Sequence, residues 1–351
     1  MEQNNESKPW VTVITATYNL VKAKREKFII QCLESVRDQS YPYIEHIVID
    51  GASTDGTVSL LQKYVDLGWI TLFSDPDRGI YDAMNKGILK AKGKYVNILN
   101  SDDFFHDKSG IEISVKYLEE NEADYSYADA CVLKSSSRKF LWKGDLEKLI
   151  TGEHYCHQTM LVKTQLLRDM GGFDLSYCVS ADSDMMIRLY AQQWRAVYVP
   201  YCFVTYRYGG YSSLHDEQVR IEHSTSLFRH IGCQMNLSKE DCFQLWELRF
   251  IIEQPYAEQL KLIDKVPKEF GSGYIKREFA IRNPIATKPS ERRTYYLLGF
   301  IPIIEMLYEE GNYRFSLFGL LDILKISILN GKWKYYLFGF IPIWKVKCHS
   351  L

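Results

Sequence analysis

Lys94–Phe105 has the sequence KYVNILNSDDFF, a short apolar run that leads directly into two adjacent carboxylates. An apolar run of this length between turn residues is typical of a strand buried in a sheet. Ligands of open α/β sheets bind at the carboxyl edge, so we expect Asp102 and Asp103 there. Adjacent carboxylates repel each other, and Mg²⁺ or Mn²⁺ bound with a substrate's phosphates would relieve that repulsion. The alternative is a solvated turn or a helix N-cap.

The chain before this stretch alternates strands with helices. Strands are expected at residues 10–16, 44–49 and 69–73, and helices at about 27–39, from 57 onward and at 80–90. Such alternation with short loops predicts a mostly parallel sheet covered by helices on both faces. Each strand delivers a polar residue to the same edge, namely Asn19, Asp50, Asp77 and Asp102.

Composition limits the class of protein. The chain has 351 residues, of which 46% are hydrophobic and 25% charged, enough for one large domain and a smaller one. A formal net charge of -1 argues against bulk electrostatic binding to nucleic acid, and none is expected as a partner. The 8 cysteines form no CxxC pair, and the polar start lacks an apolar signal segment. These features predict a reducing, cytoplasmic setting without a spanning helix.

Four segments in order resemble family 2 glycosyltransferases of the GT-A fold. They are TATYN at 15–19, VIDGASTDGT at 48–57, DRGIYDAMNKGI at 77–88 and LNSDD at 99–103. The resemblance extends over roughly residues 10–211 and implies a Rossmann-like catalytic domain at 1–216. The dinucleotide motif GxGxxG and the P-loop motif are both absent from the sequence.

The resemblance implies a nucleotide-binding role for residues at the first two strand ends. Asp50 matches the residue that accepts a hydrogen bond from the imide N–H of uracil or thymine, and a carboxylate, which only accepts, fits that donor. Thr17 and Tyr18 are expected to line the base pocket. The alternative role for Asp50 is to cap the turn that follows it.

Further donor contacts are expected from other strand ends and from the helix after the third strand. The Arg78 guanidinium suits a diphosphate, or it pairs structurally with Asp77 or Asp102. Alternatively, Lys86 is an exposed surface residue that binds no ligand. The remaining expected nucleotide-sugar contacts are Asn19, Arg78, Asp82, Asn85, Lys86, Ser101, Asp102 and His157.

The metal site is expected at the end of the opening stretch. Asn100 stands where relatives commonly carry one more carboxylate, so Asp102 and Asp103 are expected to share ribose and metal binding. Mg²⁺ or Mn²⁺ there would offset the charge that develops on a departing diphosphate. His215 is a further candidate ligand, with a surface histidine as the alternative.

The general base is expected at the start of a later helix. Family members often carry a Glu-Asp pair there, and this chain has Ala181 and Asp182. A positioned carboxylate that removes the proton of a sugar hydroxyl contributes roughly 10²–10⁴-fold to the rate. Asp182 is the expected base and Asp184 the alternative, while helix capping would account for either. His157 is expected beside the sugars, unless it is a structural histidine.

The region 217–351 is expected to be helical, and it contains a repeat. YYLLGFIPI at 295–303 recurs as YYLFGFIPI at 335–343, each preceded by basic residues. Aromatic and apolar residues beside basic ones suit the surface of a membrane. The alternative is a helical pair that packs on the catalytic domain or on a second subunit.

Together with the adjacent carboxylates, the resemblance implies a metal-dependent, inverting glycosyltransferase for hexosyl or N-acetylhexosaminyl transfer. The expected donor is a nucleoside-diphosphate sugar, with UDP favoured. The expected acceptor is a hydroxyl of a lipid-linked or glycan molecule in bacterial surface-polysaccharide or O-antigen assembly. Peripheral contact with the inner face of the cytoplasmic membrane is also expected. The alternatives are a sugar nucleotidyltransferase of similar architecture and a non-catalytic, membrane-associated scaffold.

Overall fold

The chain folds into two compact units, Met1–Phe243 and Gln244–Leu351, which are described separately. The computed structural model describes residues 8–135, 138–152, 155–210, 215–247, 262 and 265–266, and a set of strands between residues 291 and 343.

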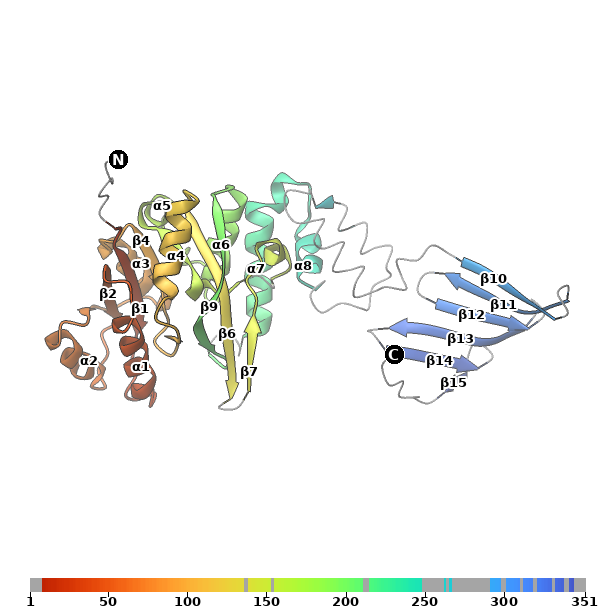
Figure 1. Ribbon diagram of the computed structural model, residues 1–351, viewed down its shortest axis with the longest axis horizontal. Helices are drawn as coiled ribbons and strands as arrows, with labels where there is room; N and C mark the ends of the chain where they lie inside the picture. The colour runs from red at the N-terminus through yellow and green to blue at the C-terminus, as the bar shows by residue number, and fades with distance from the viewer. Residues whose placement is uncertain are drawn as a thin grey trace, which may run out of the picture. The chain divides into compact units, whose positions relative to one another are not determined.

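The described part of the first unit contains a nine-stranded sheet in the order β3-β2-β1-β4-β8-β6-β9-β5, with β7 paired to β6 (Figure 1). The strands are β1 Val11–Thr17, β2 Ile44–Asp50, β3 Thr71–Ser74, β4 Tyr95–Ile98, β5 Phe104–Phe105, β6 Tyr125–Ser135, β7 Arg138–Trp142, β8 Leu161–Lys163 and β9 Ala196–Arg207. The strands β3, β2, β1 and β4 are parallel, as predicted. The other half is mixed, because β8 runs antiparallel to both β4 and β6.

The register of the parallel strands brings their carboxyl ends together. Thr17 at the end of β1 pairs with Asp50 at the end of β2, and Asp50 pairs with Ser74 at the end of β3. The chain leaves β4 toward the same edge, because Ile14 pairs with Ile98. The predicted convergence of strand ends is therefore confirmed.

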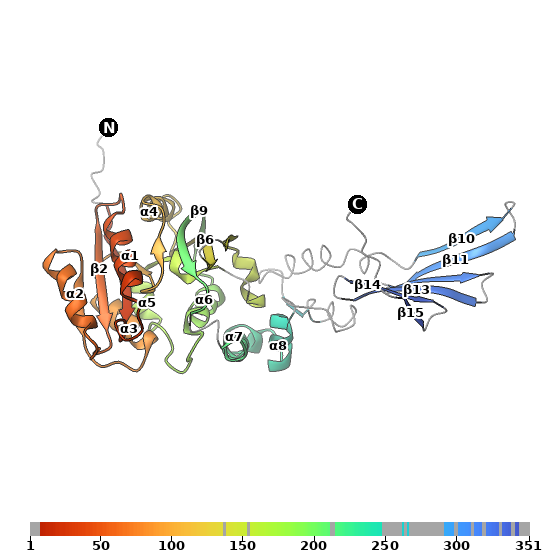
Figure 2. The same cartoon turned by 90° about the horizontal axis from the view of Figure 1, so that it is seen from below.

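Helices cover both faces of this sheet (Figure 2). The α-helices of the first unit are α1 Glu26–Arg37, α2 Thr57–Asp66, α3 Ile80–Lys90, α4 Gly110–Glu120, α5 Thr164–Asp169, α6 Ala181–Ala191, α7 Asp216–His230 and α8 Lys239–Glu247. The short 3₁₀ helices are η1 Leu146–Thr151, η2 His157–Thr159 and η4 Gly232–Gln234.

Side chains alternate along β1 and so divide between the two covering layers. Val11 and Val13 are fully buried in a core cluster that also contains residues of α1 and α4. Ile14 points to the other face, where it meets α3 at Gly87. A Cβ at Gly87 would lie 2.5 Å from Ile14 Cγ2, so glycine allows α3 to pack closely on the strand. This contact sets the position of α3 at the edge where the strands end.

The boundary between the units falls later than the predicted one at 216/217. α7 packs against α6 within the first unit, and its buried face is rich in polar residues such as Glu222, His223 and Ser226. These side chains bond to α6 and to the segment before it. Charged and polar residues on α7 thus serve an interface within the catalytic unit.

The described strands of the second unit form a six-stranded antiparallel sheet in chain order. They are β10 Glu291–Leu297, β11 Ile301–Glu309, β12 Asn312–Leu317, β13 Leu321–Leu329, β14 Lys332–Leu337 and β15 Ile341–Ile343. Both copies of the repeat pair alike, with Leu297 opposite Ile301 and Leu337 opposite Ile341.

The helical prediction for 217–351 therefore holds for α7 and α8 and is wrong for these strands. Aromatic and β-branched residues favour strands, and Pro302 and Pro342 would each interrupt a helix. No helix in the described part of the chain has the length and apolar character needed to cross a membrane. The expected membrane contact of this region stays a prediction.

Candidate functional site

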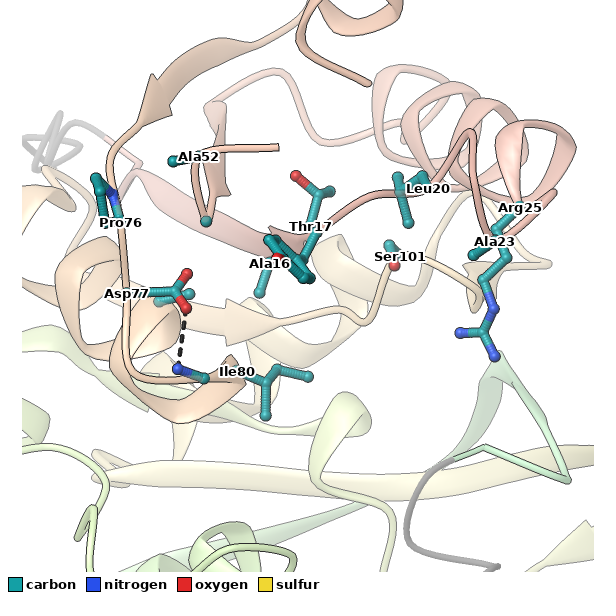
Figure 3. A pocket seen from close by; sticks show the side chains of 14 residues that line it. Ala16, Thr17, Leu20, Ala23, Arg25, Ala52, Pro76, Asp77, Ile80 and Ser101 are labelled. Atoms are coloured by element: carbon teal, nitrogen blue, oxygen red, sulfur yellow. Dashed lines mark hydrogen bonds between the residues drawn. The ribbon is translucent and has the colours of Figure 1, made fainter. Parts of the chain in front are cut away.

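A cavity of about 840 Å³ lies at the edge where β1, β2, β3 and β4 end (Figure 3). This volume is within the range of small-molecule sites. Its lining includes Tyr18 after β1, Ala52 after β2, Asp77 after β3 and Ser101 after β4. The Tyr18 side chain is 64% exposed, so its aromatic ring is accessible to a ligand. The predicted placement of Thr17, Tyr18 and Ser101 at one pocket agrees with this lining.

Asp50 is fully buried and does not face the cavity with a vacant acceptor site. Its carboxylate accepts hydrogen bonds from Thr17 Oγ1 at 3.1 Å, from Ser53 N and Oγ at 2.8 and 2.6 Å, and from Ser74 Oγ at 2.8 Å. A carboxylate offers about four acceptor positions, so these donors fill them. In this conformation Asp50 joins the ends of three strands and caps the turn after β2, which was its alternative role, and direct binding of the base by Asp50 stays a prediction.

Asp77 presents a carboxylate to the cavity instead. Its Oδ1 accepts a hydrogen bond from Gly79 N at 2.9 Å. Its Oδ2 lies 2.5 Å from the position that a Cβ would take at Gly51, so glycine at 51 leaves room for this oxygen. Asp77 is absent from the predicted contacts, although its place after a strand is visible in the sequence. The sequence does not show that Asp77 packs over Gly51 and lines the cavity, whereas Asp50 is bonded internally.

The predicted contacts on α3 lie outside the cavity lining. Arg78 is 76% exposed at its side chain and pairs with Asp82 at 3.2 Å, and Lys86 Nζ donates to Pro76 O at 2.5 Å. Burial acts to raise the pKa of Asp82, but hydrogen bonds and the charge of Arg78 outweigh it and hold that pKa below its usual value. Asp82 thus serves the N-terminal turn of α3.

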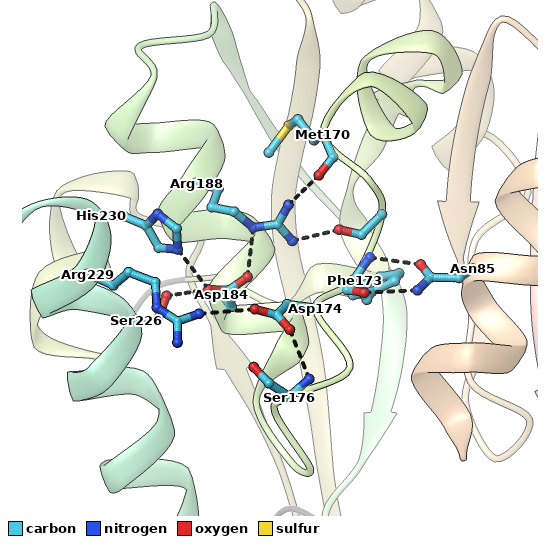
Figure 4. Close-up of polar contacts among 11 residues, drawn as sticks. Asn85, Met170, Phe173, Asp174, Ser176, Asp184, Arg188, Ser226, Arg229 and His230 are labelled. Carbon is cyan, nitrogen blue, oxygen red and sulfur yellow. Dashed lines mark hydrogen bonds and ion pairs between the residues drawn. The ribbon is translucent and has the colours of Figure 1, made fainter. Parts of the chain in front are cut away.

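Two predicted contacts use their side chains to fasten loops. The Asn85 amide donates to Phe173 O at 2.9 Å and accepts from Phe173 N at 2.8 Å, which ties α3 to the loop before α6 (Figure 4). Asn19, at φ 45°, accepts from Thr54 N at 3.1 Å. Both hydrogen-bonding ends of Asn85 are thus occupied by Phe173 in this conformation, and its contact with the sugar donor stays a prediction.

The two carboxylates of the opening stretch point into different surroundings. Asp103 is 1% exposed and accepts from Arg207 N at 2.6 Å and from Gln158 Nε2 at 2.5 Å. Burial and then the neighbouring Asp102 charge raise the pKa of Asp103 to about 7. Asp102 is 20% exposed at its side chain and pairs with Arg25 Nη1 at 3.3 Å. Arg25 lines the cavity and was not predicted, because its approach to Asp102 depends on the loop between β1 and α1.

The surroundings of Asp102 fit a metal site with few protein ligands. Among the described residues, no group of three or more His, Cys, Asp and Glu side chains could hold a metal ion. The predicted set of Asp102, Asp103 and His215 is therefore not assembled, since the bonds to Asp103 are internal and His215 directly precedes α7. Mg²⁺ commonly binds through one or two carboxylates and substrate phosphates, and Asp102 beside the cavity suits that arrangement.

Asp182 lies in the first turn of α6, where three elements meet. Its Oδ1 accepts from the Tyr81 hydroxyl of α3 at 3.1 Å, and its Oδ2 lies 2.9 Å from His157 Nδ1 of η2. Burial, followed by the Asp182 charge, raises the pKa of Tyr81 well above its usual value, so Tyr81 keeps its proton. Ile80 lines the cavity, and Tyr81, the next residue of α3, donates to Asp182. The structure thus brings together the predicted Asp182 and His157, and adds Tyr81.

Asp184 has a different environment, although it is only two residues away. It is fully buried, and its carboxylate contacts Arg188 Nε at 2.7 Å, Ser226 Oγ at 2.6 Å and His230 Nε2 at 3.2 Å (Figure 4). Burial acts to raise the pKa of Asp184, but bonds from His230, Ser226 and Arg188 outweigh it and lower that pKa. In this conformation Asp184 is bonded internally and Asp182 is the more accessible of the two candidate bases, while the assignment of the base stays a prediction.

The fold and the strand-end cavity are those of a nucleotide-binding α/β enzyme. Comparison with known proteins identifies its family. Residues 12–181 match the model of the family described as "Glycosyl transferase family 2". A PGL/p-HBAD biosynthesis glycosyltransferase of Mycobacterium bovis is 30% identical over 188 residues, which cover 52% of this chain and 70% of the relative. The chain belongs to glycosyltransferase family 2.

Other relatives are consistent with this assignment. The putative teichuronic acid biosynthesis glycosyltransferase TuaG of Bacillus subtilis is 35% identical over 122 residues, or 34% of this chain and 46% of the relative. S. aureus TarS 1–349 in complex with UDP-GlcNAc superposes with a TM-score of 0.53 at 17% identity, over 86% of this chain and 97% of that one. The mannosyltransferase PcManGT of Pyrobaculum calidifontis, with GDP-Man and Mn²⁺, gives 0.52 at 20% identity, over 80% and 82%. These structures confirm the predicted GT-A-like fold.

Proposed function

We propose that this glycosyltransferase moves a sugar from a UDP-sugar to a hydroxyl of a lipid-linked or glycan acceptor, with inversion at the anomeric carbon. The names of two relatives, for teichuronic acid and for PGL/p-HBAD biosynthesis, support a role in cell-surface glycan assembly. The UDP-GlcNAc bound to TarS supports a UDP-sugar, and a hexosyl or N-acetylhexosaminyl group, as the donor.

The donor occupies the strand-end cavity. The Tyr18 ring is available to stack on the base, and the Asp77 carboxylate suits the imide N–H of uracil as a hydrogen-bond acceptor. Arg25 offers its guanidinium to the diphosphate beside Asp102. A divalent cation, Mg²⁺ or Mn²⁺, held by Asp102 supplies positive charge to the leaving diphosphate when it is bound.

The position of Asp182 carries the proposal. Its side chain is partly exposed, and its carboxylate is held from two sides by Tyr81 and His157. Asp182 takes the proton of the acceptor hydroxyl as that oxygen forms a bond to the anomeric carbon. The bond from this carbon to the diphosphate oxygen breaks, and the electron pair leaves with the nucleotide. Inversion follows because a single displacement attacks the face opposite the leaving group.

The test is Asp182→Asn, measured as release of UDP from a panel of UDP-sugars with a glycan or lipid-linked acceptor. Loss of a general base lowers kcat by roughly 10²–10⁴-fold, while UDP affinity by calorimetry stays unchanged. Tyr81→Phe removes one of the two contacts that hold the same carboxylate, so it lowers kcat by less than Asp182→Asn does. An Asp182→Asn variant with more than half the wild-type kcat would overturn the assignment.

Two further outcomes separate the alternatives. Release of inorganic diphosphate from a nucleoside triphosphate and a sugar phosphate would identify a nucleotidyltransferase. Absence of binding and turnover with every UDP-sugar would favour a non-catalytic scaffold. We propose a location in the cytoplasm at the inner face of the cytoplasmic membrane, with residues 244–351 in peripheral contact. Cell fractionation with and without residues 244–351 tests this location.

A further inference from the structure

We propose that Glu222 of α7 is a positioning residue that holds the general base Asp182 in place. This inference rests on the proposed function, in which Asp182 deprotonates the acceptor. Glu222 lies beyond residues 12–181, the part that matches the family model, so the motifs of the catalytic half do not reveal it.

The Glu222 carboxylate binds three consecutive backbone amides. Its Oε1 accepts from Cys178 N at 2.8 Å, and its Oε2 accepts from Val179 N and Ser180 N, both at 2.9 Å. Gln218 Nε2, one turn earlier on α7, donates to Oε1 at 2.9 Å. Glu222 is 5% exposed, so these bonds form away from solvent. Charge-assisted hydrogen bonds of this kind are stronger than neutral ones.

The three amides belong to the segment that leads into the helix of the base. Ser180 is the N-cap of α6, and its side chain makes no capping hydrogen bond. The orientation of this helix start therefore depends on Glu222. Asp182 follows two residues later, and its contacts with Tyr81 and His157 are 3.1 and 2.9 Å long. A small rotation of the first turn would break these contacts, because side-chain hydrogen bonds weaken steeply beyond such distances.

The charge of Glu222 also acts on Tyr81, which donates a hydrogen bond to Asp182. Burial, the Asp182 charge and, to a smaller extent, the Glu222 charge all raise the pKa of Tyr81. Both carboxylates therefore favour the protonated hydroxyl that donates to Asp182. Glu222 acts through Tyr81 and through the chain before α6, and it does not contact the reacting atoms in this arrangement.

The interface between α6 and α7 contains several polar contacts, and Figure 4 shows part of it. Ser183 Oγ lies 3.3 Å from His223 Nδ1, and Ser226 Oγ donates to Asp184 at 2.6 Å. Directional bonds allow one register between two helices, whereas an apolar interface tolerates sliding. We infer that α7 serves to set the position of α6, and that Glu222 fixes the segment leading into the helix that carries the base.

The experiment compares Glu222→Ala and Glu222→Gln with Thr225→Ala, whose hydroxyl bonds only to Ile221 O of its own helix. Transfer to the acceptor, hydrolysis of the UDP-sugar without acceptor, and hydrogen exchange at residues 178–180 are measured. We expect kcat for transfer to fall at least tenfold in Glu222→Ala and less in Glu222→Gln. The KM for the donor stays within twofold, and exchange at residues 178–180 becomes faster. Thr225→Ala behaves like the wild type.

A folded Glu222→Ala variant with faster exchange and a transfer kcat within twofold of wild type would overturn the inference. If this variant does not fold, Glu222→Gln, which keeps the shape but replaces one acceptor oxygen by a donor, decides by the same criterion. A donor KM raised more than twofold with an unchanged kcat for transfer would also contradict a role in positioning the base. Failure of the proposed function is distinguishable, because the wild type itself would then release no UDP.

Discussion

Replacing Asp184 by Asn should destabilise the protein without acting on the chemistry. Removal of one partner of a buried ion pair costs about 3–5 kcal/mol. Arg188 keeps its bonds to Met170 O and Gly172 O at 3.0 and 2.6 Å, and Asn can still accept from Ser226, so the low end of about 3 kcal/mol is expected. For a unit of this size that lowers Tm by about 6–12 °C.

Calorimetry of Asp184→Asn beside Asp174→Asn is the assay. Asp174 pairs with Arg229 at 3.1 Å in the same cluster, but both side chains are substantially exposed, so its loss costs about 0–1 kcal/mol. The lowered pKa of Asp184 adds a pH signature. The ionised Asp184 carboxylate stabilises the folded protein above a pH of about 4, which is the pKa of Asp in the unfolded chain. This stabilisation is lost as the pH falls. The difference in Tm between Asp184→Asn and the wild type should therefore become smaller at acidic pH. An unchanged Tm together with abolished turnover would refute the structural role of Asp184.

Three further predictions follow from single contacts. Gly51→Ala pushes its Cβ against Asp77. The Kd for UDP, measured by calorimetry, should therefore rise about tenfold with little change in Tm. An unchanged affinity for UDP would exclude Asp77 from the base site. Asn85→Ala removes both bonds to Phe173 and lowers the free energy of unfolding in urea by about 1–3 kcal/mol. Burial lowers the pKa of His46 to about 3. The unfolded chain binds its proton near pH 6.5, so from pH 6.5 to 5 stability falls by about 2 kcal/mol, and His46→Gln removes this part of the slope.

Local patterns predicted the elements of the nucleotide half closely. The strands expected at 10–16 and 44–49 are Val11–Thr17 and Ile44–Asp50, and the helix expected at 80–90 is Ile80–Lys90. Each element was recognisable because apolar spacing reflects burial on one or both faces. The repeat near the end misled the helical prediction, since short apolar runs suit strands and helices alike and pairing between strands is not local.

The candidate site was only partly accessible from sequence. Asp102, Asp182 and the strand-end edge were predicted because they follow recognisable elements. Asp50 and Asp184 are acidic residues in equally suggestive places, yet their neighbours saturate them. The sequence contains no signal for that difference, because the saturating donors come from segments as far away as α7.

The amino-acid order alone determined the family, the succession of strands and helices in the nucleotide half, and the edge of the sheet at which the carboxylates gather. These depend on spacing along the chain, which is a local property. The tertiary structure decided which carboxylate is exposed and which is bonded internally, and it brought Arg25, Tyr81 and Glu222 to the site. The reason is physical: burial and hydrogen-bond saturation are set by partners that are distant in sequence, and they decide whether an acidic side chain can meet a substrate.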